Sequence, residues 1–321
     1  MNRLKLVAAL FAAALVSGPL AAQTVDEVNA KFNEAAELIN AKKLPDAIPA
    51  LEQTIELGLK VGEEALPTVQ QAQKLLPNCY YYKGGITARS GDMEGALAAL
   101  TKANELGELY GDMKTVNNSR NLISQVYRAM GADAFNNKDY AKAAEIFSKG
   151  FEANPTDTEL GLNLAKSYAE MGDKAKAYEV YGQIIALEGR HSKYAEPAQQ
   201  AKEEMATYIL IDAAAAAKNK DFDNVAALTQ QVFDVDSTNA DAAMLYILTA
   251  NNVQKYDKVI ELGEFAVTVQ TDPEKKSDAY FFLGSAYQNT ENKDKAIAAY
   301  KNVLTGEYVA TAKAQIAALS K

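Results

Sequence analysis

Residues 127–155 read YRAMGADAFNNKDYAKAAEIFSKGFEANP. Small and large apolar residues recur three or four positions apart on both sides of the polar run Asn136–Asp139, which is the spacing of one face of an α-helix. Asn and Asp within this run favour a turn. The stretch therefore predicts a helix–turn–helix hairpin, with a repeating unit of about 34 residues.

The same hairpin pattern recurs along the chain. A small apolar residue opens the second helix of each unit, and successive examples lie 49, 47, 34, 48, 34 and 37 residues apart: Ala47, Ala96, Ala143, Ala177, Val225, Val259 and Ala296. One such hairpin is weak evidence, because it cannot bury its own apolar face. Seven in order predict a stacked array.

The composition favours an all-α fold. Hydrophobic residues make up 48% of the chain, and there is no Trp. Ala, Leu, Lys, Glu and Gln lose little side-chain entropy in a helix. We expect a helix at residues 308–319 that covers the end of the stack, preceded by hairpins at about residues 28–57, 77–107, 124–157, 158–188, 206–239, 240–273 and 277–305.

The turns and the helix contacts have their own sequence signals. An Asp four positions before the small residue can cap the second helix, and Gly91 and Gly172 can adopt positive φ before it. The Asp residues are Asp92, Asp139, Asp173 and Asp221. Small residues let the two helices of a hairpin approach closely, and we expect larger residues from the next hairpin to fill the groove: Gly84, Gly131, Ala165, Ala213 and Gly284.

Three gaps between the small residues exceed the unit length and correspond to segments 58–76, 108–121 and 188–205. Lengthened helices would absorb them at about 1.5 Å per residue, whereas loops or an extra helix are the alternatives. We favour lengthened helices because residues 69–88 and 115–135 have a nearly continuous helical pattern.

The first 22 residues have the three parts of a secretory signal peptide. Arg3 and Lys5 precede an apolar run at residues 6–16, and small residues end at Ala22. The run is too short to span about 30 Å of hydrocarbon. We therefore expect an exported mature chain, residues 23–321, that is periplasmic or secreted and has no transmembrane segment.

Net charge and cysteine content limit the partners and the chemistry. Removal of residues 1–22 changes the formal charge from −9 to −11, because it removes two basic residues and no acidic one. Such a chain repels nucleic acid and anionic lipid. One Cys excludes an intramolecular disulfide framework.

The hairpin pattern resembles the tetratricopeptide repeat family over nearly all of residues 28–304. The best matches are the third hairpin and the seventh, with Tyr280, Leu283-Gly284, Tyr287 and Ala296. Departures from the pattern are Thr229, Ile247 and Gly263. The resemblance implies a right-handed α-solenoid of about seven repeats with a C-terminal capping helix, in which the first helices line a concave groove that binds a protein or peptide.

The family's groove positions identify candidate binding residues. They are Tyr81, Tyr82, Arg128, Asn163, Lys166, Asn251, Asn252, Phe281 and Phe282. Tyr and Arg are frequent interface anchors, and Arg128 and Lys166 come from adjacent hairpins and could meet an acidic chain end. Core packing is the alternative for Phe281, Phe282 and the run Tyr80–Tyr82, and is expected for about half of them.

The sequence offers little for catalysis. His191 lies in a polar segment with no partner ligand near it, which favours a solvated surface residue. Cys79 precedes three Tyr residues on an apolar helix, which favours a buried, inert thiol. An acidic cluster lacks the Gly and Glu of a calcium loop, which favours turn and capping roles: Asp234, Asp236, Asn239 and Asp241. We expect no catalytic residue, metal or cofactor.

Three functions remain to be compared. The first is an exported scaffold that binds a partner protein or peptide, with membership of an envelope complex as one setting. The second is an envelope binder of glycans or small molecules, although the lipid-anchored Cys and the Trp-rich lobe usual in such proteins are missing. The third, an enzyme, lacks an evident nucleophile–base pair. We favour the scaffold.

Overall fold

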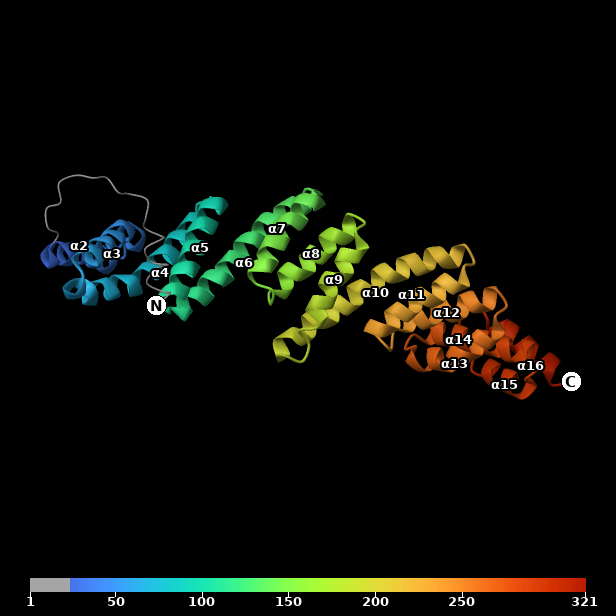
Figure 1. The fold of residues 1–321 in the computed structure, drawn as a ribbon. Coiled ribbons are helices and arrows are strands. Elements are labelled where there is room, and N and C mark those ends of the chain that lie inside the picture. The colour runs from blue at the N-terminus through green and yellow to red at the C-terminus, as the bar shows by residue number, and fades with distance from the viewer. Residues whose placement is uncertain (1–23) are drawn as a thin grey trace. The chain divides into compact units, whose positions relative to one another are not determined.

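The computed structural model describes residues 24–321, whose regular structure is entirely helical (Figure 1). Within these residues no strand occurs. The predicted signal peptide, residues 1–22, lies outside the described part. The chain divides into two compact units, one ending at Asp173 and one beginning at Lys174.

The described part of the first unit consists of seven α-helices and two 3₁₀ turns. In chain order they are α2 (Val25–Asn40), η1 (Leu44–Ala47), α3 (Ile48–Val61), η2 (Glu63–Ala65), α4 (Leu66–Arg89), α5 (Met93–Tyr110), α6 (Met113–Asn136), α7 (Tyr140–Ala153) and α8 (Thr158–Glu170).

The second unit consists of eight α-helices and one 3₁₀ turn. They are α9 (Lys174–Ile185), η3 (Ser192–Tyr194), α10 (Ala195–Lys218), α11 (Phe222–Val235), α12 (Ala240–Asn252), α13 (Tyr256–Val269), α14 (Pro273–Asn289), α15 (Lys293–Tyr300) and α16 (Val309–Leu319). The predicted final helix is present as α16.

Helices pack in the order of the chain, and alternate helices also touch. In the first unit each helix contacts the next, and α4 also contacts α2 and α6, while α6 contacts α8. In the second unit α12 likewise contacts α10 and α14. Consecutive hairpins stacked through their first helices are the arrangement of an α-solenoid, and the predicted all-α solenoid class is confirmed.

Close contact within a hairpin depends on glycine. A Cβ atom at Gly131 would lie 2.4 Å from the Phe147 ring, and one at Gly284 would lie 2.7 Å from the Tyr300 ring. These partners belong to the second helix of the same hairpin. The prediction of close approach is therefore confirmed, and at these two glycines the nearest large residue comes from the same hairpin. Larger residues of the next hairpin pack against the pair elsewhere, as Ile123 and Val126 do against Ala96 and Leu100. A large residue on the second helix reaches the glycine first, because the two helices of a hairpin are the nearest neighbours.

Seven turns between first and second helices share one residue with positive φ. Gly91 (φ 90°) and Gly172 (φ 80°) are the two predicted from glycine, and the other five are Lys42, Lys138, Lys220, Gln254 and Glu291, with φ from 57° to 63°. At most of these turns the next residue donates its backbone N–H to a carbonyl of the last helical turn, as Asp139 does to Ala134 at 3.0 Å. This bond closes the end of the first helix.

The capping Asp residues and the lengthened helices follow the predictions. Asp92, Asp139 and Asp221 accept hydrogen bonds from backbone N–H groups of the second helix at 2.8, 3.1 and 3.2 Å. Asp173 directly precedes α9. The three long gaps end in first helices of 24 residues each, namely α4, α6 and α10. The preference for lengthened helices is confirmed.

Candidate partner-binding face

The predicted binding residues lie on first helices, which form a connected layer in each unit. We call this layer the first-helix face. In the first unit it comprises α4, α6 and α8, and in the second α10, α12 and α14. Tyr81, Tyr82, Arg128, Asn163 and Lys166 belong to the first unit. Asn251, Asn252, Phe281 and Phe282 belong to the second, so the nine residues form two separate sets.

Tyr82 is the most exposed aromatic residue of the set. Its side chain is 46% exposed, and its ring meets the Tyr81 ring edge to face at a centroid distance of 5.6 Å. Tyr81 is half-buried and packs against a cluster from α5 and α6 that contains Leu100 and Ile123. Tyr81 therefore anchors the pair, and the ring of Tyr82 is open to solvent.

Arg128 is already engaged by a carboxylate of the same face. Its guanidinium, on α6, forms an ion pair with Glu159 at the start of α8, and its side chain is 28% exposed. Asn163 and Lys166, one and two turns further along α8, are half-buried. A partner carboxylate would compete with Glu159 for Arg128. The residue Glu159 was not among the predicted ones, although its position two turns before Lys166 was a signal.

The aromatic pair of the second unit is covered by other parts of that unit. Phe282 is 5% exposed and lies in a core cluster with Ile247 and Ala250 of α12. Phe281 stacks on Tyr308, with centroids 4.2 Å apart and planes at 11°. Core packing, the alternative given for these residues, therefore describes Phe282, while Tyr308 covers Phe281.

Asn251 and Asn252 end α12. Asn252 is exposed, whereas the side-chain Oδ1 of Asn251 is buried and has no hydrogen-bond donor among the described residues. A buried acceptor without a donor is costly. These two amides are the part of the second-unit set that a ligand could still satisfy.

The two candidate reactive residues have structural roles. Cys79 is 1% exposed, and burial raises the pKa of its thiol to about 11. Such a thiol stays protonated and unreactive at neutral pH. His191 is exposed, and its Nδ1 accepts a hydrogen bond from the backbone N–H of Lys193 at 3.2 Å. The predicted burial of Cys79 and the predicted exposure of His191 are confirmed.

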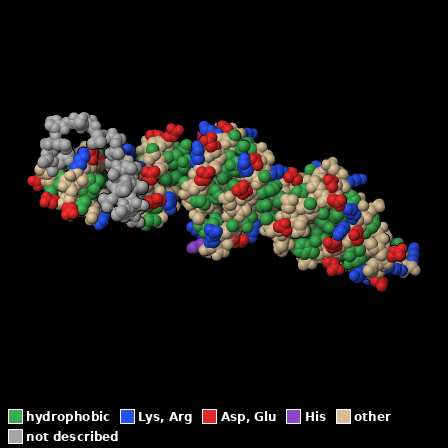
Figure 2. All heavy atoms as spheres, viewed as in Figure 1, with side chains coloured by type: hydrophobic (Ala, Val, Ile, Leu, Met, Phe, Trp, Pro, Cys, Tyr) green, Lys and Arg blue, Asp and Glu red, His purple; other side chains and the backbone are tan. Residues whose placement is uncertain are grey.

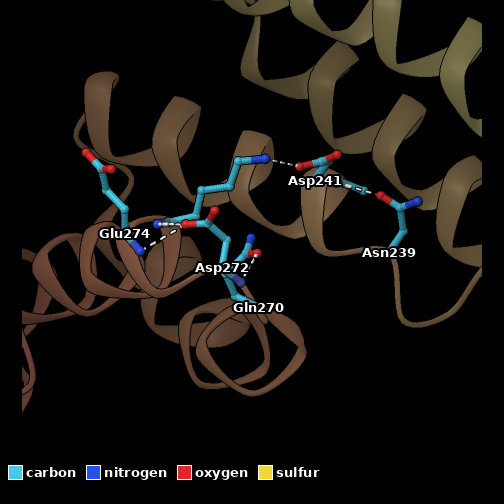
Figure 3. Close-up of polar contacts among 7 residues, drawn as sticks. Asn239, Asp241, Gln270, Asp272 and Glu274 are labelled. Carbon is cyan, nitrogen blue, oxygen red and sulfur yellow. Dashed lines mark hydrogen bonds and ion pairs between the residues drawn. The ribbon is translucent and has the colours of Figure 1, made fainter. Parts of the chain in front are cut away.

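The acidic cluster lies around the start of α12, where Figure 3 shows Asn239 and Asp241 with their partners. Asn239 caps α12 through the backbone N–H of Ala242 at 2.9 Å, and Asp236 accepts from the Thr238 backbone at 3.1 Å. Asp241 pairs with Lys275 of α14 at 2.8 Å. Among residues 24–321 no group of three acidic, Cys or His side chains is placed to hold a metal ion.

A shallow pocket of about 370 Å³ lies between α13, α14 and α15. Tyr287 donates its hydroxyl to Glu264 at 3.1 Å in this pocket, and the Lys295 ammonium lies 5.2 Å from the centroid of the Tyr287 ring. On the surface drawn in Figure 2, acidic and basic side chains are interspersed with apolar ones. None of the helices in the described part is long and apolar enough to cross a membrane.

The stacked helical hairpins define an α-solenoid repeat protein. Family models of the tetratricopeptide repeat match residues 134–196 and 277–305, and the second match has the bounds predicted for the seventh hairpin. The chain therefore contains tetratricopeptide repeats over these two ranges.

Solved structures give weaker similarities. A crystal structure of MamA is 21% identical, covers 57% of this chain and 90% of its own, and has a TM-score of 0.31. The structure of MamA residues 41 to the end from Desulfovibrio magneticus RS-1 is 18% identical, covers 56% of this chain and 93% of its own, and has a TM-score of 0.32. The P58(IPK) TPR domain is 15% identical, covers 92% of this chain and 97% of its own, and has a TM-score of 0.30. These TM-scores are low. No curated protein matches the sequence.

Proposed function

We propose that the chain is an exported scaffold that binds a partner protein or peptide on the first-helix face of its first unit. A protein-interaction scaffold is the role that tetratricopeptide repeats support. The observation that carries the choice of face is the exposed ring of Tyr82, braced by Tyr81, on the helix next to the one that carries Arg128. Tyr and Arg on neighbouring elements are the side chains that most often dominate binding energy.

Site-specific crosslinking tests the scaffold and its face. A photoreactive p-benzoylphenylalanine replaces Tyr82 on α4, and in a matched variant it replaces Glu145, an exposed residue of the second helix α7. Both variants are made as the full chain in cells and irradiated. We expect a discrete protein adduct from position 82 and none from position 145. Adducts from position 145 alone, or none from either site, would overturn the proposal.

Export is the part of the proposal that rests on residues 1–22. The charged start, the apolar run and the small residues before Gln23 support it. Mass spectrometry of the protein purified from fractionated cells tests it. We expect the mature chain to begin at Gln23 and to be recovered outside the cytoplasm. An intact Met1 in the cytoplasmic fraction would remove export from the proposal.

We also propose that the chain catalyses no reaction of its own. Support comes from the buried, protonated thiol of Cys79 and from the backbone contact that occupies His191. The purified protein is expected to hold its partner without changing the partner's mass. A covalent change in the captured partner that depends on this chain would contradict this part of the proposal.

The second candidate function is the binding of a glycan or small molecule. The specific observation in its favour is the pocket with Tyr287, Glu264 and Lys295, which combines a ring with charged groups. Thermal-shift screening against saccharides tests it, because a ligand bound only by the native state raises the Tm. A rise that Tyr287→Phe and Lys295→Ala abolish would favour this candidate over the scaffold.

A further inference from the structure

Two neighbouring first helices of the first unit have a charge opposite to that of the chain. Together α4 and α6 contain six basic residues and a single acidic residue, Asp133, whereas the whole chain has 33 basic and 42 acidic residues. The basic residues are Lys74, Lys83, Arg89, Lys114, Arg120 and Arg128. A local excess of one sign against the net charge creates a potential that attracts the opposite charge.

Polar residues of these helices form one stripe on each helix. Residues spaced three or four apart share a helix face. The α4 stripe holds Gln71, Lys74, Asn78, Tyr82 and Arg89, and the α6 stripe holds Lys114, Asn117, Asn121, Gln125 and Arg128. We call these ten residues the cationic face. All are exposed except Arg128, which is half-buried, and none is acidic.

The two stripes belong to helices that touch. Leu122 of α6 approaches within 3.6 Å of the position that a Cβ atom would take at Gly85 of α4. Tyr81 and Leu122 also pack against one core cluster, with Leu100. Gly85 places no side chain between α4 and Leu122 of α6.

Three cations of this face have no carboxylate partner in the described part of the chain: Lys74, Arg89 and Lys114. By contrast, Arg120 pairs with Glu108 of α5 at 2.6 Å, and Arg128 pairs with Glu159. The neighbouring first helices are acidic. Helix α2 contains four acidic residues and one Lys, and α8 contains Glu159 and Glu170 with one Lys. The cationic face is therefore a bounded strip.

We infer that the cationic face binds an extended, acidic peptide segment of a partner protein. The inference rests on the proposed scaffold function and names the chemistry of its partner. Lys and Arg attract Asp and Glu side chains of the segment. The five Asn and Gln side chains both donate and accept, so they can satisfy the N–H and C=O groups of an extended backbone. Tyr82 adds an apolar contact with a polar tip.

The size of the face also fits a peptide. A helix of 24 residues, such as α4, is about 36 Å long, and about ten to eleven extended residues span that length. A single-stranded nucleic acid would also meet the cations, but such ligands are held mainly by stacking on several aromatic side chains. Tyr82 is the exposed aromatic of the ten residues.

Fluorescence anisotropy with synthetic peptides tests the inference. The probe is a labelled peptide of about ten residues that alternates Glu and Gly, and the reference probes replace Glu by Gln or by Lys. We expect the Glu peptide to bind at least about tenfold more tightly than the other two at low salt. Its affinity should fall as salt rises, because exposed charges are screened. Equal binding of the Gln peptide would overturn the inference.

A charge-matched pair of variants locates the site. One variant combines Lys74→Glu, Arg89→Glu and Lys114→Glu, and the control combines Lys42→Glu, Lys138→Glu and Lys142→Glu, three exposed lysines of the same unit. Both change the net charge equally. We expect the first variant to lose at least about tenfold in affinity for the Glu peptide, because each exposed ion pair contributes up to about fivefold in affinity. The control should lose less than twofold. Equal losses in both would reduce the effect to net charge and overturn the inference.

Two further arms separate the possible outcomes. An oligothymidylate of about ten nucleotides that binds as tightly as the Glu peptide would identify a general polyanion surface and overturn the peptide assignment. If no peptide binds while position 82 still crosslinks to a protein, the acidic-segment inference fails and the scaffold proposal stands. If position 82 gives no adduct, the scaffold proposal fails whatever the peptides do.

Discussion

Two aromatic pairs occupy the same register in different units and have opposite environments. Tyr81 and Tyr82 lie three and two residues before Gly84 on α4, and Phe281 and Phe282 lie three and two residues before Gly284 on α14. Yet Tyr82 is 46% exposed and Phe282 is 5% exposed. The repeat pattern alone therefore does not decide which positions are free to bind.

The difference arises from the neighbouring helices. In the first unit the core cluster takes its α4 residues from Val69 to Tyr80, so the preceding hairpin packs on the first half of the lengthened helix and leaves Tyr82 beyond it. In the second unit, Phe282 packs with Ala243 and Ile247 of α12, and the residue before α16, Tyr308, closes over Phe281. The extra length of α4 therefore leaves Tyr82 exposed, whereas the segment that ends the repeat array covers Phe281 and Phe282.

The largest effect is expected from truncating the two rings at equivalent positions. Phe282→Ala should lower the free energy of unfolding by about 3–5 kcal/mol, because it leaves a cavity in the core. Tyr82→Ala should lower it by less than about 1 kcal/mol, as for an exposed residue with one ring contact. Urea denaturation followed by circular dichroism measures both. Similar losses in the two variants would break the comparison.

The second-largest difference is expected between a glycine on α4 and a glycine on α14. Gly284→Ala should cost about 1–3 kcal/mol, because its Cβ would lie 2.7 Å from the Tyr300 ring. Gly85→Ala should be neutral or stabilise by up to about 1 kcal/mol, since its Cβ would lie 3.6 Å from Leu122 and Ala is the better helix former. Denaturation midpoints of the pair measure the difference. A loss at Gly85 as large as that at Gly284 would mean that α4 and α6 pack as tightly as a hairpin.

The features that recur in every hairpin could be predicted from the sequence. The spacing of the small residues predicted the hairpins, and the Asp and Gly residues before the second helices predicted caps and left-handed turns at Asp92, Asp139 and Gly91. Left-handed residues such as Lys138 and Gln254 carry no such signal, because Lys and Gln have no preference of their own for positive φ and the surrounding hairpin imposes the conformation. Residues with a propensity of their own were thus predictable, and those constrained by the fold were not.

The candidate site depended on contacts that no single repeat encodes. Tyr308 lies 27 residues after Phe281, in the connection to the last helix, and no repeat position anticipates a ring there. One local signal was nevertheless available. Phe can be buried without a hydrogen-bond partner, whereas burial of a Tyr hydroxyl without one costs free energy. This difference separates the exposed Tyr82 from the buried Phe282. The cationic face was visible as well, in the absence of acidic residues from α4.

Truncation of Tyr308 tests whether this ring is what buries Phe281 in the second unit. Tyr308→Ala should cost about 0.5–1.5 kcal/mol for the lost stacking on Phe281, in addition to the lost buried area. It should leave binding of the acidic peptide unchanged, because Tyr308 belongs to the other unit. Tyr308→Phe, which keeps the ring, is the matched control and should retain the stability. An unchanged stability in Tyr308→Ala would show that α16 alone covers Phe281.

The smallest effects on stability are expected at two ion pairs that each join neighbouring first helices. Arg128 joins α6 to Glu159 of α8, and Lys275 joins α14 to Asp241 of α12. Both are solvent-exposed on at least one side, so Arg128→Ala and Lys275→Ala should each change the free energy of unfolding by no more than about 1 kcal/mol.

The effects of these two substitutions on peptide binding should differ. Arg128→Ala should weaken the acidic peptide several-fold, because the guanidinium lies on the cationic face, whereas Lys275→Ala should leave it unchanged. Glu159→Gln should strengthen binding, since it frees Arg128 from an internal competitor. If Lys275→Ala weakened the peptide as much as Arg128→Ala, the two first-helix faces would be equivalent in binding despite their different cover.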